Sequence, residues 1–534
     1  MTADAVTEAA TGVATTSGHA SEAMAAQGAL TLMDHLPVLI VLVPFLAAPI
    51  VVLIGSRRLA WPITFGAALF SLGAALSLLG QVLDGSAISY QIGGWAPPLG
   101  IEYRVDAANA FVLMIVSAIA VVILPYARVS IAAEIPRRHL VLFHALFLLS
   151  FTGLLGVAAT GDAFNIFVFL EISSLSTYVL VALGAARDKR ALTTAYNYLM
   201  MGTIGATFFV IGIGFLYQST GTLNLADLAT HIATQPDNRT IHAGFAFILV
   251  GLGLKVAMYP LHLWLPNAYT YAPSAVSAYL AATATKVAVY VMLRFLFTVF
   301  GPAFPFEVTA LTWVIAPLAL LAMFAASFIA IFQANFKKML AYSSVAQIGY
   351  MLLGIAMLSE TALSGTIVHL FNHALTKATL FMVVGAFVLR TGSAFYKSLE
   401  GIGRVMPWTA AAGVIGGLSL IGVPGTAGFV SKWLLVQAAL EKGWWWVAFL
   451  IVGSSLLAVV YVWRGIEVIF LRPPAPDMDR REAPLMMLVP IWVMALASIW
   501  FGLSAGLTVG AARTAAEALM NGVTEVVTSG VPGR

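Results

Sequence analysis

The chain has 534 residues, of which 60% are hydrophobic and only 9% are charged, and its formal net charge is +4. Soluble globular domains carry about 25% charged residues, so this composition excludes a set of soluble domains and indicates a polytopic helical membrane protein. Because the chain has no cysteine, it cannot hold an iron–sulfur cluster, a cysteine–zinc site or a disulfide by itself. No nucleotide-binding or metalloprotease motif is found, and we expect no cofactor, metal ion or nucleic acid as a ligand.

The N-terminal segment 1–34 is rich in Ala, Thr, Ser and Gly and carries only acidic charges, since the first basic residue is Arg57. A secretory signal needs a positive start and an apolar centre, and this segment has neither. We therefore predict a disordered extension, and Met24 or Met33 are alternative start sites.

Fourteen hydrophobic segments follow, most of them longer than the ~20 residues that span a bilayer. They are expected at 36–54, 61–82, 107–127, 139–159, 163–184, 195–217, 241–261, 273–298, 307–332, 338–357, 363–389, 407–437, 444–470 and 484–510. The predicted fold is therefore an all-α polytopic membrane protein with about 14 transmembrane helices, a membrane domain over 35–512 and a C-terminal tail over 513–534.

Basic residues in the predicted loops are distributed unevenly between the two sides of the membrane. If the first span runs from outside to inside, sixteen Lys and Arg residues lie inside and five outside. Since basic loops stay in the cytoplasm, we predict both termini on the outer side of a bacterial inner membrane.

The seventh and eighth segments each hold one lysine deep in an apolar run, Lys255 and Lys286. A lysine at the centre of a span costs roughly 2.5–3.5 kcal/mol on insertion scales. Pro260 and Pro266 interrupt the end of the first run, and a proline within a span frees backbone carbonyls. Freed carbonyls beside buried charges indicate a hydrated cavity.

A weak internal repeat relates 172–184 to 342–354, because Ser173, Ser174 and Gly184 match Ser343, Ser344 and Gly354 at an offset of 170. These segments lie five spans apart, so the copies are inverted, as in many transporters. We predict two inverted five-helix repeats over about 139–298 and 307–470, with broken helices 7 and 12. The broken helices carry Lys255 and Lys432.

Glu171 is an acidic residue in the interior of the fifth span, and a carboxylate there requires a partner to stay ionised. Lys255 is the natural partner, and opening of such a pair would favour loss of the lysine's proton. The alternative is a purely structural pair that fixes helix packing.

Further candidates lie on later spans. Lys286 shares its helix face with Tyr279 and Tyr290, while Lys432 follows the Pro424–Gly425 break as a possible last proton carrier or a solvated surface lysine.

His369, His373 and Lys377 are four residues apart on one face, which favours a proton relay. Metal binding by His369 and His373 is the alternative, but the sequence offers no third ligand for the metal.

Three further expectations concern single positions. His262 is either a relay entrance or a turn anchor, Arg294 is expected near the outer surface, and Arg464 and Glu467 are expected to pair.

The run KVAMYPLHLWLPNAYTYAPSAVSA resembles the antiporter-like subunits of respiratory complex I and of Mrp-type multisubunit antiporters. AYSSVAQIGYMLLG, FNHALTKATLFMVVGA and SLIGVPGTAGFVSKWLLVQ resemble the same family in the same order. The resemblance implies fourteen helices and a lateral row of charged residues at the membrane midplane. It also implies that Glu171 is the fifth-helix glutamate, Lys255 and Lys286 the seventh- and eighth-helix lysines, and Lys432 the charged residue of helix 12. The chain departs from the family at Asn267–Tyr269, where relatives often carry acidic and His residues.

Two functions follow as hypotheses. The first is the D-type subunit of a multisubunit Na⁺ or K⁺/proton antiporter, in which protons move through Glu171, Lys255, Lys286, His369, His373 and Lys432. The alternative is a non-redox, proton-pumping membrane subunit of an NADH–quinone oxidoreductase or a membrane-bound hydrogenase. A membrane partner for inorganic-carbon uptake is a third possibility. In each case we expect other subunits, the lipid bilayer, protons and monovalent cations as partners.

Overall fold

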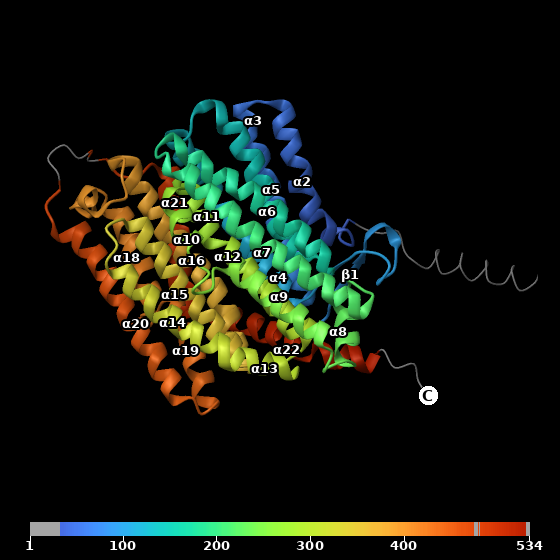
Figure 1. Ribbon diagram of the computed structural model, residues 1–534. Helices are drawn as coiled ribbons and strands as arrows, with labels where there is room; N and C mark the ends of the chain where they lie inside the picture. The colour runs from blue at the N-terminus through green and yellow to red at the C-terminus, as the bar shows by residue number, and fades with distance from the viewer. Residues whose placement is uncertain (1–31, 475–478, 480, 530–534) are drawn as a thin grey trace, which may run out of the picture.

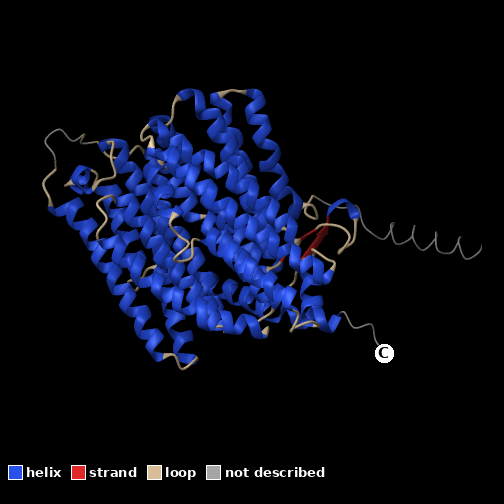
Figure 2. Cartoon of the chain, viewed as in Figure 1, coloured by secondary structure: helices blue, strands red, loops and turns tan. Residues whose placement is uncertain are grey.

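The computed structural model describes residues 32–474, 479 and 481–529, so most of the predicted N-terminal extension lies outside the described residues. In this part of the chain, thirteen helices are long and apolar enough to cross a membrane, or fourteen if one bent pair counts as a span. Figure 2 shows that the rest is loop and one two-stranded sheet. The all-α polytopic fold with about fourteen spans is confirmed.

A β-hairpin lies between the second and third spans. Helices α2 (Leu36–Ile54) and α3 (Arg57–Val82) meet at Gly55, whose φ of 60° is left-handed. Strands β1 (Ile88–Gln91) and β2 (Glu102–Val105) then pair antiparallel. Helix α4 (Ala107–Glu134) begins at a capping box, in which the Asp106 side chain accepts from the N–H groups of residues 108 and 109.

The next group of helices covers the first predicted repeat. It comprises η2 (Arg137–His139), α5 (Leu140–Ala159), α6 (Ala163–Ala182), η3 (Leu183–Ala186), α7 (Arg190–Thr220), α8 (Leu225–Ala233), α9 (Arg239–Val256), α10 (Trp264–Tyr271), α11 (Ser274–Ala282), α12 (Ala284–Leu293) and the π-helical turn η4 (Arg294–Phe300).

The remaining helices cover the second predicted repeat and the C-terminal end. They are α13 (Pro305–Ala310), the π-helical turn η5 (Leu311–Ile315), α14 (Ala316–Ile331), α15 (Phe336–Ala356), α16 (Glu360–Thr391), η6 (Tyr396–Leu399), α17 (Ile402–Val405), α18 (Pro407–Ile421), α19 (Ala427–Glu441), α20 (Trp445–Ile466), the π-helical turn η7 (Glu467–Leu471), α21 (Leu485–Leu503) and α22 (Gly506–Ser529). The last predicted span is therefore shorter than expected, and α22 is a separate helix that contacts α4, α8 and α16 (Figure 1).

Three spans are interrupted. Helix α9 ends at Ala257, a non-glycine residue with φ of 63°, and α10 resumes at Trp264. The α11–α12 span breaks at Thr283, with φ of −124° and ψ of −60°. Helices α18 and α19 are separated by Gly422 and Gly425, both with positive φ. Breaks in helices 7 and 12 were predicted; the break at Thr283 was not, because no Pro or Gly marks it.

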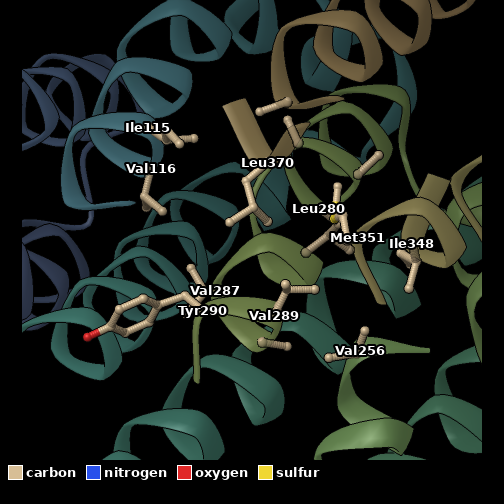
Figure 3. Close-up of a cluster of buried hydrophobic side chains, with 14 of the residues drawn as sticks. Ile115, Val116, Val256, Leu280, Val287, Val289, Tyr290, Ile348, Met351 and Leu370 are labelled. Atoms are coloured by element: carbon tan, nitrogen blue, oxygen red, sulfur yellow. The ribbon is translucent and has the colours of Figure 1, made fainter. Parts of the chain in front are cut away.

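The centre of the molecule is formed by helices that the chain itself covers. In the spans Ser274–Phe300 and Phe336–Ala356, 94% of the residues in the 18-residue apolar stretch are buried within the protein, whereas in Leu485–Leu503 only 33% are. Figure 3 shows apolar side chains of α11, α12, α15 and α16 in one cluster, including Leu280, Val287, Met351 and Leu370. Polar residues on these central helices are therefore enclosed by protein rather than by lipid.

Candidate functional site

Glu171 on α6 and Lys255 on α9 form a partly buried ion pair. The Lys255 Nζ lies 2.8 Å from Glu171 Oε1 and also donates to Ser174 Oγ at 2.9 Å. The Lys255 and Glu171 side chains are 8% and 22% exposed, respectively. Lys255 stands in the last turn before α9 is interrupted at Ala257, so its ammonium is held where a helix ends inside the membrane domain.

Lys286 lies just after the break in the α11–α12 span and is 1% exposed. Its Nζ donates to the Ala281 carbonyl and, at 3.3 Å, to Thr285 Oγ1. The break at Thr283 separates the two helices that supply these partners. In the described part of the chain, no carboxylate forms an ion pair with Lys286, so carbonyl and hydroxyl oxygens alone stabilise the ammonium.

His369, His373 and Lys377 all lie on α16 and are buried. The two imidazole rings are nearly parallel with centroids 6.1 Å apart, and His369 Nδ1 lies 2.9 Å from Ser431 Oγ of α19. Lys377 Nζ donates to Ser343 Oγ at 2.6 Å. Both ring nitrogens of His373 and Nε2 of His369 have no protein partner among the described residues, which leaves them able to exchange hydrogen bonds with water.

Lys432 on α19 is the last of these groups in chain order. Its Nζ donates to the carbonyls of Leu420 and Ile421, at 3.0 and 2.8 Å, which the break between α18 and α19 leaves open. It also lies 4.9 Å from the centre of the Tyr350 ring, and that ring is 5.8 Å from His369. Lys432 is therefore buried beside the Tyr350 ring, which also neighbours His369, rather than solvated at the surface.

The helices that carry these groups pack in sequence: α9 contacts α12, α11 contacts α16, and α16 contacts α19. Amines and imidazoles along such a row exchange protons through intervening water. No group of three or more His, Cys, Asp or Glu residues suited to a metal ion occurs in the part of the chain that the structure describes. The chemistry of these amines and imidazoles is suited to proton transfer.

Helix α4 carries a buried carboxylate at each end, which sequence reasoning missed. Asp106 forms a two-fold ion pair with Arg294, with Nη1 and Nη2 each 2.8 Å from a carboxylate oxygen. Glu134 Oε2 accepts from the backbone N–H of Ser274 at 3.0 Å. Burial alone would raise the pKa of Asp106, but the Arg294 guanidinium outweighs this and holds that pKa below its ordinary value. Both ends of the α11–α12 span are thus fixed to α4.

Other expectations have mixed outcomes. Arg294, expected near the outer surface, begins the η4 turn and is only 7% exposed, paired with Asp106. The expected Arg464–Glu467 pair is wrong: Arg464 donates to the Ile331 carbonyl and Glu467 pairs with Arg472 at 3.3 Å. Arg464 binds a carbonyl of the neighbouring helix α14 instead of the carboxylate three residues along its own helix. His262 is buried with its ring stacked on Tyr259, and this does not distinguish an anchor from a relay entrance.

The chain is similar to proteins of one family over most of its length. A family model described as NADH:quinone oxidoreductase/Mrp antiporter matches residues 160–458. The N subunit of the NADH-quinone oxidoreductase of Desulforudis audaxviator is 40% identical, covering 88% of this chain and 96% of that protein. The D-type subunit of the Na(+)/H(+) antiporter of Alkalihalophilus pseudofirmus is 30% identical, covering 76% and 81%.

Solved structures agree with the sequence relatives. A chain of the Mrp complex from Dietzia superposes with a TM-score of 0.86 at 27% identity, covering 93% of this chain and 99% of that one. A chain of the membrane-bound sulfane sulfur reductase, an archaeal respiratory membrane complex, superposes with a TM-score of 0.84 and the same identity and coverage.

Proposed function

This chain belongs to the family of membrane subunits shared by NADH:quinone oxidoreductases and Mrp antiporters, and from that premise we propose how its buried side chains move protons. It is a proton-translocating, antiporter-like subunit of a multisubunit antiporter or respiratory complex. The Glu171–Lys255 pair acts as the switch, and Lys286 and the α16 histidines carry protons towards Lys432. The proposed residues are Glu171, Lys255, Lys286, His369, His373 and Lys432.

The observation that carries this proposal is the 2.8 Å contact between Glu171 and Lys255 at the interrupted end of α9. While the pair is closed, the carboxylate stabilises the ammonium. When it opens, burial disfavours the charged amine, and Lys255 gives up its proton or displaces one from the next carrier.

We further propose that the complex is driven by redox chemistry. The relative from NADH-quinone oxidoreductase is more similar, at 40% identity over 88% of this chain, than the antiporter relative at 30% over 76%. The D-type antiporter role remains the second candidate because the Mrp chain superposes with a TM-score of 0.86. We also propose that the face with the basic loops lies inside the cell and the termini outside.

Proton uptake into inverted vesicles that hold the whole complex tests the proposal. Lys255→Ala is expected to stop uptake while Lys397→Ala, a change at an exposed lysine, leaves it at the parental rate. Parental uptake in Lys255→Ala would overturn the proposed route. Co-purification with flavin and iron–sulfur subunits supports the redox complex, whereas sodium- or potassium-dependent exchange without them supports the antiporter.

A further inference from the structure

An apolar groove of about 780 Å³ opens on the side of the protein, between α14 and α20. Its walls are formed by η5, α14 and the start of α20, and Leu353 of α15 lines it as well. The lining side chains are Ala, Pro, Val, Leu, Phe and Trp, with the Thr312 hydroxyl at one end. Figure 1 shows α20 at the edge of the helical bundle, so the groove faces the surroundings of the chain in the membrane.

The groove exists because α14 and α20 are tied together only at its deep end. Ser454 Oγ of α20 donates to the Met323 carbonyl of α14 at 3.1 Å, and Tyr350 Oη of α15 lies 3.1 Å from Ser455 Oγ. In the described chain, no hydrogen bond joins residues 312–322 to residues 444–453. The two helices therefore leave space between them from these serines towards the face opposite the basic loops.

The groove has the length of one leaflet of a bilayer. Its lining residues on η5 and α14 run from Thr312 to Phe324, twelve residues apart, which at 1.5 Å per residue cover roughly 18 Å. Half of a hydrocarbon core about 30 Å thick is about 15 Å. A single acyl chain therefore fits along the groove from the membrane surface to the midplane.

The shallow end of the groove carries tryptophans and an ammonium group. Trp444 lines it there, and Trp313, at the same end, is 76% exposed. Tryptophan is enriched at the level of the lipid headgroups. The exposed Lys442 holds its Nζ 4.7 Å from the centre of the Trp444 ring and donates to the Met357 carbonyl at 2.7 Å. This ammonium has further N–H donors and stands where the phosphate of a lipid in the groove would lie.

A transmembrane helix of another subunit fits this surface less well than a lipid does. Helices associate in membranes through small residues, which let their backbones approach, and through hydrogen bonds between helices. The groove is lined mainly by Leu, Phe and Trp side chains, and Thr312 supplies its one hydroxyl. An acyl chain conforms to such walls and needs no hydrogen-bond partner.

We propose that this groove binds one phospholipid of the leaflet opposite the basic loops, with one acyl chain between α14 and α20 and its phosphate on Lys442. The inference goes beyond the proposed function and does not rest on the proton route. The deep end of the groove lies beside the contact between Tyr350 and Ser455, and the Tyr350 ring also neighbours Lys432 and His369. The bound chain braces the helices that hold this ring.

The number of phospholipids retained by the purified complex tests the site. Ala316→Phe places a ring in the groove, so after extensive detergent washing the complex is expected to hold one phospholipid fewer per copy of the chain than the parent. Leu496→Phe adds bulk on the exposed face of α21 and is the matched control, which is expected to keep the parental number. An unchanged number in Ala316→Phe would overturn the site.

Lys442→Gln tests the headgroup contact without filling the groove. Loss of a charged donor is expected to weaken binding of phosphatidylglycerol to the lipid-depleted complex about tenfold. Diacylglycerol, which has no phosphate, is expected to bind the parent and Lys442→Gln equally. Lys397→Gln, at an exposed lysine outside the groove, is the control for the loss of a charge. Equal affinity of parent and Lys442→Gln for phosphatidylglycerol would refute the role of the ammonium.

Photo-crosslinking identifies the occupant, because the chain contains no cysteine of its own. Leu321→Cys, in the groove wall, is labelled with a benzophenone maleimide and irradiated in the intact complex. Mass spectrometry of this chain is expected to find a phospholipid adduct. An adduct with another subunit would assign the groove to a partner helix, and the absence of any adduct would show that nothing occupies it; either result overturns the proposal.

The outcomes separate this inference from the proposed function. If Ala316→Phe loses a phospholipid while Lys255→Ala keeps the parental uptake rate, the lipid site stands and the proton route fails. If Lys255→Ala stops uptake while Ala316→Phe retains every phospholipid, only the lipid site fails.

Discussion

Replacing Glu171 by Gln removes the negative charge that lies 2.8 Å from the Lys255 ammonium. At that separation two unit charges attract by about 6 kcal/mol at an effective dielectric constant of about 20. Desolvation offsets part of this attraction, and removing one member of a buried pair costs about 3–5 kcal/mol. Because Glu171 is 22% exposed, we take the lower value, which corresponds to about a hundredfold.

The assay is the initial rate of proton uptake into vesicles that hold equal amounts of complex. Glu171→Gln is expected to lower this rate about a hundredfold. Ser174→Ala removes only a neutral partner of the same ammonium, at 2.9 Å, so it is expected to cost about 1 kcal/mol, or roughly fivefold. The Glu171→Gln/Lys255→Met double variant is expected to lose much less than the sum of the two single losses.

Two results would refute this reasoning. The first is an equal, small loss in Glu171→Gln and Ser174→Ala, since the charge would then contribute no more than a hydroxyl. The second is strict additivity in the double variant, since two side chains that act as one switch must be coupled.

Three further predictions concern other parts of the fold. Asp106→Asn leaves Arg294 buried without its partner and is expected to destabilise the chain by about 3–5 kcal/mol in thermal unfolding. The pKa of Asp106 is lower in the folded chain than in the unfolded chain. The ion pair therefore contributes its full stability above the unfolded-state pKa and loses it as the pH falls through the folded-state pKa, so the difference in stability between parent and variant should shrink over that range. Gly428→Ala places a Cβ much closer to the Ser419 carbonyl oxygen than van der Waals contact allows, so it is expected to separate α18 from α19 and lower the yield of assembled complex; normal assembly would contradict the close packing. His373→Leu replaces a buried ring, whose nitrogens have no hydrogen-bond partner among the described residues, by an apolar side chain of similar size; it is expected to slow proton uptake with little change in thermal unfolding, and a large loss of stability would assign the residue to packing instead.

Hydrophobic length and buried charge predicted most of this architecture. Runs of apolar residues place most span ends within about five residues, the C-terminal ends of α4 and α21 excepted, because a bilayer imposes a minimum length. Lys255 and Lys432 stand out because a lysine inside such a run is costly, and the nearby Pro and Gly residues mark their breaks.

The missed features share another cause. The Asp106–Arg294 pair joins residues 188 positions apart, and Asp106 lies in a polar stretch where an acid is unremarkable in sequence. Glu134 ends its helix beside basic loops, and only folding brings it to Ser274, 140 positions later. The Arg464–Glu467 prediction failed for the converse reason, because local spacing takes no account of the neighbouring carbonyl of Ile331.

The two acidic ends of α4 restrict the motions open to the α11–α12 span. One end of that span is tied through Ser274 and the other through Arg294, so sliding or rotating it as a rigid rod would break a buried contact. Displacement is then concentrated at Thr283, three residues before Lys286. Small bends there swing the amine through an arc while the ends of the helix stay where they are.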